Sequence, residues 1–213
     1  MTETDWLDCT DARRMLEYQY NQAIAEKPAL LVGLRLKFWG KTQPLGIVSD
    51  RKLRLFACAC CRSAWDDLDD GTRRVIEVAE AAADQRVSSA ELRRAAGRSR
   101  SPIAVWLAAE SIHEQPSWLF LNWLATGNPE KTDEQMALLR HVIGNPYRPS
   151  PSHSYLPSTV VQLANALYEG EDCNFALHDA LLDAGHPNLA DHFDQEQQHP
   201  KGCWALDLIL GKS

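Results

Sequence analysis

Residues 49–65 are the stretch that most constrains how this chain can fold. Ser49 and Asp50 are good helix N-caps, because a short side-chain oxygen accepts hydrogen bonds from the free amides of a first helical turn. Apolar residues then recur at spacings of three and four, while the basic residues fall mostly on the other side, which is the period of a helix that buries one face. The predicted central helix spans residues 50–66, and its inward positions are Leu53, Phe56, Ala57, Cys60 and Ala64.

The same period recurs along the rest of the chain and predicts about ten short helices. No hairpin signal and no series of alternating strands accompanies it, so the sequence predicts an all-α fold, a compact multi-helix bundle. Helix and strand compete over residues 29–39, and helix is favoured because a lone strand is unstable.

A proline-rich segment at residues 144–157 divides the chain, because its four prolines preclude regular structure. The predicted organisation is an N-terminal helical region at residues 1–143, this linker, and a C-terminal helical region at 158–213. We expect the last region to pack back on the first.

Composition and charge limit the kinds of partner and the cellular compartment that we expect for this protein. Apolar residues make up 45% of the 213 residues, which is enough for a core, and the net charge of −7 disfavours nucleic-acid binding by the whole surface. No apolar run is long enough to span a membrane, and the acidic start lacks the regions of a signal peptide. A cytoplasmic protein with reduced cysteines and no membrane partner is therefore expected.

Three of the six cysteines lie in the central helix. Cys58 and Cys61 are three residues apart, so they share a helix face. Small, soft cysteines can fill a tight helix crossing, and this is the simplest interpretation of the pair. Metal chelation is an alternative that needs further ligands, and redox chemistry is a third, although the pair lies within a helix with no strand before it.

A second group of candidate ligands lies near the C-terminus: His186, His192, His199 and Cys203. If the fold brings them to the cysteine pair, a structural zinc site can form. The predicted ligands are Cys58, Cys61, His186, His199 and Cys203. The alternative is that no cofactor binds, with His192 and His199 solvated and Cys203 in the core.

The first turn of the central helix carries Arg51, Lys52 and Arg54. Together with the arginines between residues 93 and 100, they could form a basic patch that contacts phosphates. Acidic turns flank this helix, and no helix-turn-helix pattern is clear. Nucleic acid is therefore a candidate partner that the net charge disfavours.

Several motifs resemble a family of bacterial proteins abundant in planctomycetes, for which no activity is established. Its hallmarks are the Asp-Arg-Lys-Leu-Arg-Leu-Phe-Ala-Cys-Ala-Cys-Cys-Arg run and a C-terminal Gly-Cys-Trp-x-Leu-Asp-Leu-Ile-Leu-Gly-Lys run. The resembling segments are residues 6–11, 15–17, 50–65, 144–149, 180–185 and 199–212.

The sequence departs from this family in two places. About 25 extra residues intervene at roughly 22–47, before the central helix. Where relatives often carry two cysteines, this chain has His186, which keeps a potential metal ligand, and Phe193, which does not.

For function, the sequence predicts a non-catalytic helical interaction or regulatory module that binds a protein partner. It carries no Gly-x-Ser-x-Gly, Walker, Gly-x-Gly-x-x-Gly or His-Glu-x-x-His motif, so no enzyme is expected. The alternative is a zinc-binding helical protein with a structural cysteine and histidine site, with or without nucleic-acid binding.

Overall fold

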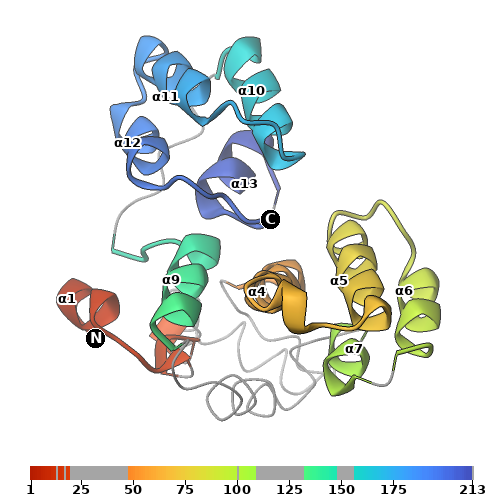
Figure 1. Ribbon diagram of the computed structural model, residues 1–213. Helices are drawn as coiled ribbons and strands as arrows, with labels where there is room; N and C mark the ends of the chain where they lie inside the picture. Colours follow the sequence, from red (N-terminus) through yellow and green to blue (C-terminus); the bar gives the residue numbers. More distant parts are fainter. Residues whose placement is uncertain are drawn as a thin grey trace, which may run out of the picture. The chain divides into compact units, whose positions relative to one another are not determined.

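The computed structural model describes residues 1–12, 14–16, 18–19, 48–99, 101–108, 132–147 and 156–212. Every regular element in these ranges is a helix, which confirms the predicted all-α class (Figure 1). Among these residues, no helix is long and apolar enough to cross a lipid bilayer. The chain divides into two compact units, residues 1–139 and 140–213.

Within the described residues, the N-terminal unit contains five complete α-helices, one short 3-10 helix, helical residues at 12, 14–16 and 18–19, and the first part of α9 (Thr132–Ile143). The predicted central helix is α4, which begins after the Ser49 cap and ends at Arg62, four residues earlier than expected. The complete helices are α1 (Glu3–Leu7), α4 (Asp50–Arg62), α5 (Asp70–Ala83), α6 (Ser89–Ala96) and α7 (Pro102–Leu107), with the 3-10 helix at Trp65–Asp67.

Short polar side chains fix where these helices begin. Ser49 accepts a hydrogen bond from the amide of Lys52, and Asp69 accepts one from the amide of Thr72. Ser88 and Glu91 form a reciprocal capping box at the start of α6. Each pair satisfies amides that a first helical turn otherwise leaves without acceptors.

Helix α5 is the hub of the N-terminal unit, since it packs against α4, α6 and α7, and α6 also packs on α7. Two ion pairs join α4 to α5. Arg51 reaches Asp84 at 2.9 Å, and Arg62 contacts Glu80 through two hydrogen bonds of 2.6 and 2.9 Å. Charge therefore reinforces the apolar contact between these two helices.

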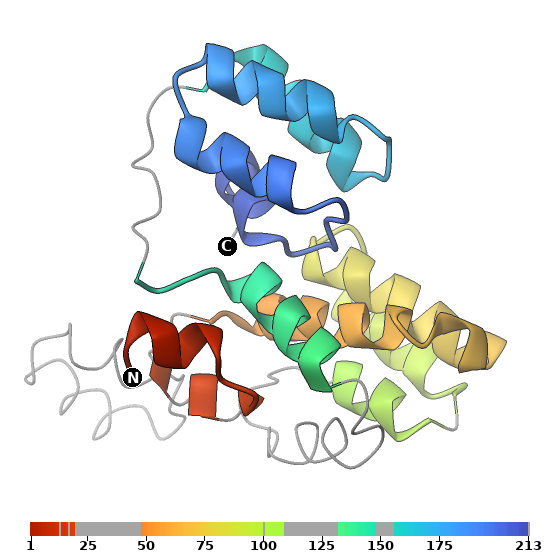
Figure 2. The same ribbon diagram turned by 60° about the vertical axis from the view of Figure 1, so that its left-hand side comes forward.

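The C-terminal unit begins in the last turn of α9 (Thr132–Ile143). It continues through α10 (Ser158–Tyr168), α11 (Asn174–Asp183), α12 (Pro187–Gln195) and α13 (Trp204–Leu210). Helix α11 lies beside α12, and α10 packs against both α11 and α13 (Figures 1 and 2). Among the fully buried residues of its core are Leu177, Leu181, Phe193, Cys203 and Leu206.

Some sequence predictions fall outside the described residues. These include the competition between helix and strand at 29–39 and the extra residues expected at about 22–47. Of the predicted linker, the structure describes residues 144–147 and 156–157. The expected packing of the C-terminal region on the first stays a prediction.

Candidate metal centre

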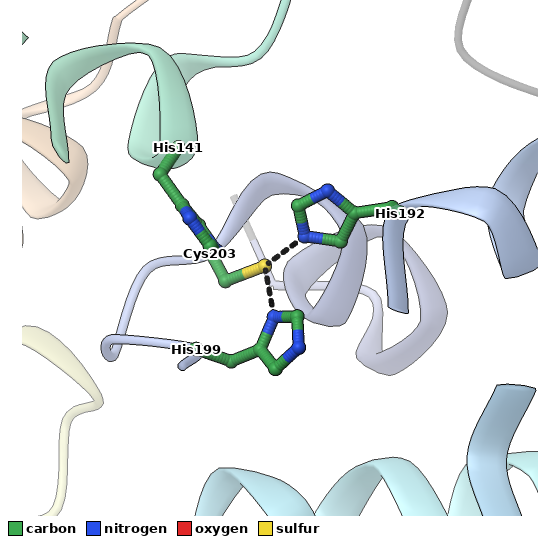
Figure 3. Close-up of side chains that lie close together, drawn as sticks. All are labelled: His141, His192, His199 and Cys203. Atoms are coloured by element: carbon green, nitrogen blue, oxygen red, sulfur yellow. Dashed lines mark hydrogen bonds between the residues drawn. The ribbon is translucent and has the colours of Figure 1, made fainter. Parts of the chain in front are cut away.

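Three histidines and one cysteine converge inside the C-terminal unit. His141, His192, His199 and Cys203 each offer one ligand atom, and these atoms all lie within 4.8 Å of one another. His141 comes from the last turn of α9 and His192 from α12, while His199 and Cys203 come from the segment before α13 (Figure 3). The group therefore collects ligands from three separate parts of this unit.

Local backbone geometry places two of these side chains, those of His192 and Cys203. Helix α12 ends where the amide of Glu196 bonds the carbonyl of His192, so His192 lies in its last turn. The chain then turns at Gly202, whose φ of 89° is a conformation that residues with a Cβ rarely adopt. The next residue, Cys203, is the N-cap residue of α13, and its amide bonds the carbonyl of Pro200 at 2.9 Å.

A close contact between Gly144 and Trp204 places the end of α9, which carries His141. Gly144 follows α9 directly with a φ of 78°, and a Cβ built on it would lie 3.2 Å from Cγ of Trp204. The absence of a side chain here lets the end of α9 rest on Trp204, the residue after Cys203. His141, three residues before Gly144, is thereby held near the sulfur.

The distances within the group suit a tetrahedral ion. Sγ of Cys203 lies 3.2 Å from Nε2 of His192 and 3.7 Å from Nδ1 of His199. The ring centroids of the three histidines are 4.9, 5.1 and 5.4 Å apart. Ligand atoms about 2.0–2.3 Å from a tetrahedral zinc lie roughly 3.3–3.8 Å from one another, which is close to the two distances from Sγ, while any pair near the 4.8 Å limit would have to move closer.

An outer hydrogen bond orients the ring of His199. Nε2 of His199 lies 2.9 Å from Oδ1 of Asn174, on the side of the ring opposite the nitrogen near the sulfur. Nδ1 of His141 lies 4.0 Å from Oε2 of Glu196, beyond hydrogen-bond distance, and its Nε2 is buried. Metal-binding histidines commonly have a hydrogen-bond partner like that of His199, because it fixes the ring orientation and the tautomer.

Electrostatics keeps two of the imidazoles neutral. Burial, helped by the neighbouring His141 and His199, lowers the pKa of His192 to about 3. Burial also lowers the pKa of His199 to about 4, against the opposing effect of a hydrogen bond to the backbone of Glu196. Neutral imidazole is the form that binds a metal ion. The donor set, its burial and its protonation state therefore all fit a transition-metal ion.

The order Cys203–His199–Asn174 also matches the nucleophile, base and orienting group of some thiol hydrolases. Two observations weigh against that chemistry. Cys203 has 0% of its surface exposed, so a substrate carbonyl has no access to Sγ. The low pKa of His199 also opposes the imidazolium that activates a thiolate in such enzymes.

Two of the five ligands predicted from sequence, His199 and Cys203, belong to the group. His186 is the half-buried residue before α12, and it is not a member. Cys58 and Cys61 lie in α4 of the N-terminal unit, and they are not members either.

The α4 cysteines have the surroundings of packed thiols. Cys58 and Cys61 are 1% and 2% exposed, and Sγ of Cys58 faces the backbone carbonyl of Ile76 at 3.9 Å. Burial raises the pKa of Cys61 to about 12, and burial together with Glu80 raises the pKa of Cys58 well above its usual value. Both are therefore protonated at neutral pH, as thiols that fill a helix contact would be.

The basic residues of α4 have contacts inside their own unit. Arg51 pairs with Asp84, and Nε of Arg54 donates to the carbonyl of Leu107 at 3.1 Å. Lys52 is half-buried in the first turn of the helix. Two of the three thus have structural roles, and nucleic-acid binding by this set stays a prediction.

The sequence interpretation did not include His141, and it placed His192 outside its ligand set. His141 precedes the first of the other ligands by 51 residues, so no local spacing connects them. The one available signal was the Gly-Asn-Pro-Tyr-Arg-Pro motif at residues 144–149, just after His141. The motif alone does not show that His141 is a ligand, because only the fold brings His141 close to the other three residues.

Comparisons with models of known protein families, with curated proteins and with solved structures found no match.

Proposed function

We propose that this protein binds one zinc ion in its C-terminal unit, and that the ion has a structural role there. The proposed ligands are Nε2 of His141, Nε2 of His192, Nδ1 of His199 and Sγ of Cys203. The observation that carries the proposal is the convergence of these four ligand atoms within 4.8 Å.

The chemistry of the donors supports zinc over other common ions. Three imidazoles and one thiolate are borderline to soft ligands, whereas magnesium and calcium select oxygen. Four protein ligands complete a tetrahedral shell, which is the hallmark of structural zinc sites, while catalytic sites keep one position open. The full burial of Cys203 also favours a structural role.

A structural ion would stabilise a folded unit as small as this one. Residues 140–213 form a small unit, and domains below about 70–80 residues commonly need a disulfide, a metal or another cross-link beyond their core. All six cysteines are free thiols, and a metal ion is a cross-link that remains stable with reduced cysteines. In this unit the ion would join the end of α9, α12 and the start of α13.

The direct test is the metal content of the full chain, purified without chelator and measured by elemental mass spectrometry. We expect about one zinc per chain in the wild type. Cys203→Ser and His199→Gln should each lower this stoichiometry, while Cys173→Ser, which changes a half-buried cysteine of the same unit, should not. A wild type without zinc, also after incubation with zinc and gel filtration, would refute the proposal.

Cys58→Ser extends this test to the ligands predicted from sequence. The proposal expects the zinc content of this variant to equal that of the wild type, because all four proposed ligands lie elsewhere. The interaction with a protein partner, which the sequence also predicts, stays a prediction.

A further inference from the structure

We infer that Asn174 is a positioning residue that selects Nδ1 of His199 as the nitrogen that binds the metal. This inference rests on the proposed zinc site and assigns a role to a residue that is not itself a ligand. Asn174 is the first residue of α11, a helix that contributes none of the four ligands.

Three contacts fix the orientation of the Asn174 amide. One of its two terminal atoms lies 2.6 Å from the carbonyl oxygen of Phe193 and 3.2 Å from that of Glu196. A carbonyl oxygen can only accept hydrogen bonds, so the atom that faces both of them must be the NH2 group. The remaining atom, the amide oxygen, must then face His199.

This orientation determines the tautomer of His199. The amide oxygen of Asn174 lies 2.9 Å from Nε2 of His199, and because this oxygen only accepts, Nε2 must carry the proton. A neutral imidazole has one protonated nitrogen, so Nδ1 keeps its lone pair. Nδ1 is the nitrogen that lies 3.7 Å from Sγ of Cys203. The tautomer that binds metal through Nδ1 is therefore set before an ion arrives.

The same contacts hold the ligand segment in place. The two carbonyls that accept from Asn174 belong to residues on either side of the end of α12, the helix that carries His192. Asn174 thus links the tautomer of one ligand to the backbone that follows another. Outer partners of this kind typically change metal affinity by about 10–100-fold when they are removed.

The test compares the wild-type full chain with Asn174→Ala, using Asn165→Ala as the matched control. Asn165 lies in the same unit, and its side chain donates one exposed hydrogen bond, to the carbonyl of Val161. Zinc affinity, measured by competition with a chromophoric chelator, should fall about 10–100-fold in Asn174→Ala and stay unchanged in Asn165→Ala. Equal affinity in Asn174→Ala and wild type would overturn the inference.

A second readout separates positioning from stability. Long-range proton–nitrogen NMR of histidine-labelled wild type should show His199 protonated at Nε2, both without zinc and with zinc bound at Nδ1. Zinc at Nε2 of His199 would overturn the inference, even if Asn174→Ala does not fold. If the wild type bound no zinc, the proposed function would fail, while the tautomer of the metal-free protein would still test the role of Asn174.

Discussion

At His192, burial and the two neighbouring imidazoles act in the same direction, and together they lower its pKa to about 3. Without a metal, this crowding is unfavourable whenever the pH is low enough to protonate a histidine. With a metal, the same crowding places neutral donors around one point.

The lowered pKa values predict how the stability of the metal-free protein depends on pH. In the unfolded chain both histidines titrate near 6.5, but in the folded chain His192 titrates near 3 and His199 near 4. Between these values the unfolded state binds more protons, so protonation favours unfolding. Stability should be full above about pH 6.5 and should decline as the pH falls toward 4.

Urea unfolding in the presence of a chelator, at several pH values between 7 and 4, measures this decline. His192→Gln should flatten the dependence, because it removes the group with the largest shift. A dependence that is the same in the wild type and in this variant would contradict the assignment.

His141 provides a sharper test, because only the fold identifies it as a ligand. We expect His141→Gln to weaken zinc binding by at least about 100-fold, since a three-ligand shell opens to water. His178→Gln is the matched control, because His178 lies in the same unit and pairs with Asp179 at the surface of α11. Chelator competition measures both, and an unchanged affinity in His141→Gln would exclude His141 from the shell.

At the scale of helices and their contacts, comparing Gly144 with Gly185 measures the effect of one contact, that between Gly144 and Trp204. Gly144 and Gly185 have nearly equal φ angles of 78° and 79°, but a Cβ at Gly144 would lie 3.2 Å from Trp204, whereas a Cβ at Gly185 would have nothing within 4 Å. Alanine at either position should cost about 1–2 kcal/mol in backbone strain. Gly144→Ala should cost about 1–3 kcal/mol more, because residue 144 and Trp204 must move apart.

Zinc affinity should follow the same difference, falling in Gly144→Ala and staying near wild type in Gly185→Ala. Unfolding curves and chelator titrations of both variants measure this. Equal behaviour of the two variants would show that the contact between Gly144 and Trp204 does not support the site.

The ion pair between Arg51 and Asp84 gives a prediction for the N-terminal unit. Its side chains are 11% and 3% exposed, so Arg51→Ala removes a cation 2.9 Å from a buried carboxylate, which Arg86 approaches at 3.8 Å. We expect a loss of about 3 kcal/mol, the lower end of the range for breaking a buried pair. Arg74→Ala, which removes an exposed pair, should cost about 0.5 kcal/mol or less in the same unfolding experiment. Similar losses in the two variants would contradict this account.

The helices were largely predictable because capping residues close in the sequence determine where many of them begin and end. The caps at Ser49 and Ser88, and the glycine after α13, lie where the sequence places them. Helix α4 ends earlier than expected because a 3-10 turn begins at Trp65. Local hydrogen bonds determine such features, and a short stretch of sequence contains all of the groups involved.

The site was only partly predictable, because it depends on contacts between distant parts of the chain. The sequence pointed to His199 and Cys203 through their proximity, but the spacing of Cys58 and Cys61 drew attention to another helix. His141 reaches the group through a glycine that packs on Trp204. No periodicity in the sequence encodes that contact.

For the whole molecule, the central claim is that one of the two units contains a complete metal site. As its alternative function, the sequence suggested a site shared between α4 and the C-terminal segment, with up to three cysteine ligands. The structure instead groups one cysteine with three histidines, all within residues 140–213. The number of sulfur ligands therefore separates the two hypotheses.

X-ray absorption spectroscopy at the zinc edge, on the full wild-type chain loaded with one equivalent of zinc, counts those ligands directly. Our account predicts a four-coordinate ion with one sulfur at about 2.3 Å and three imidazole nitrogens at about 2.0–2.1 Å. Two or more sulfur ligands, or a spectrum of zinc surrounded by oxygen alone, would contradict it.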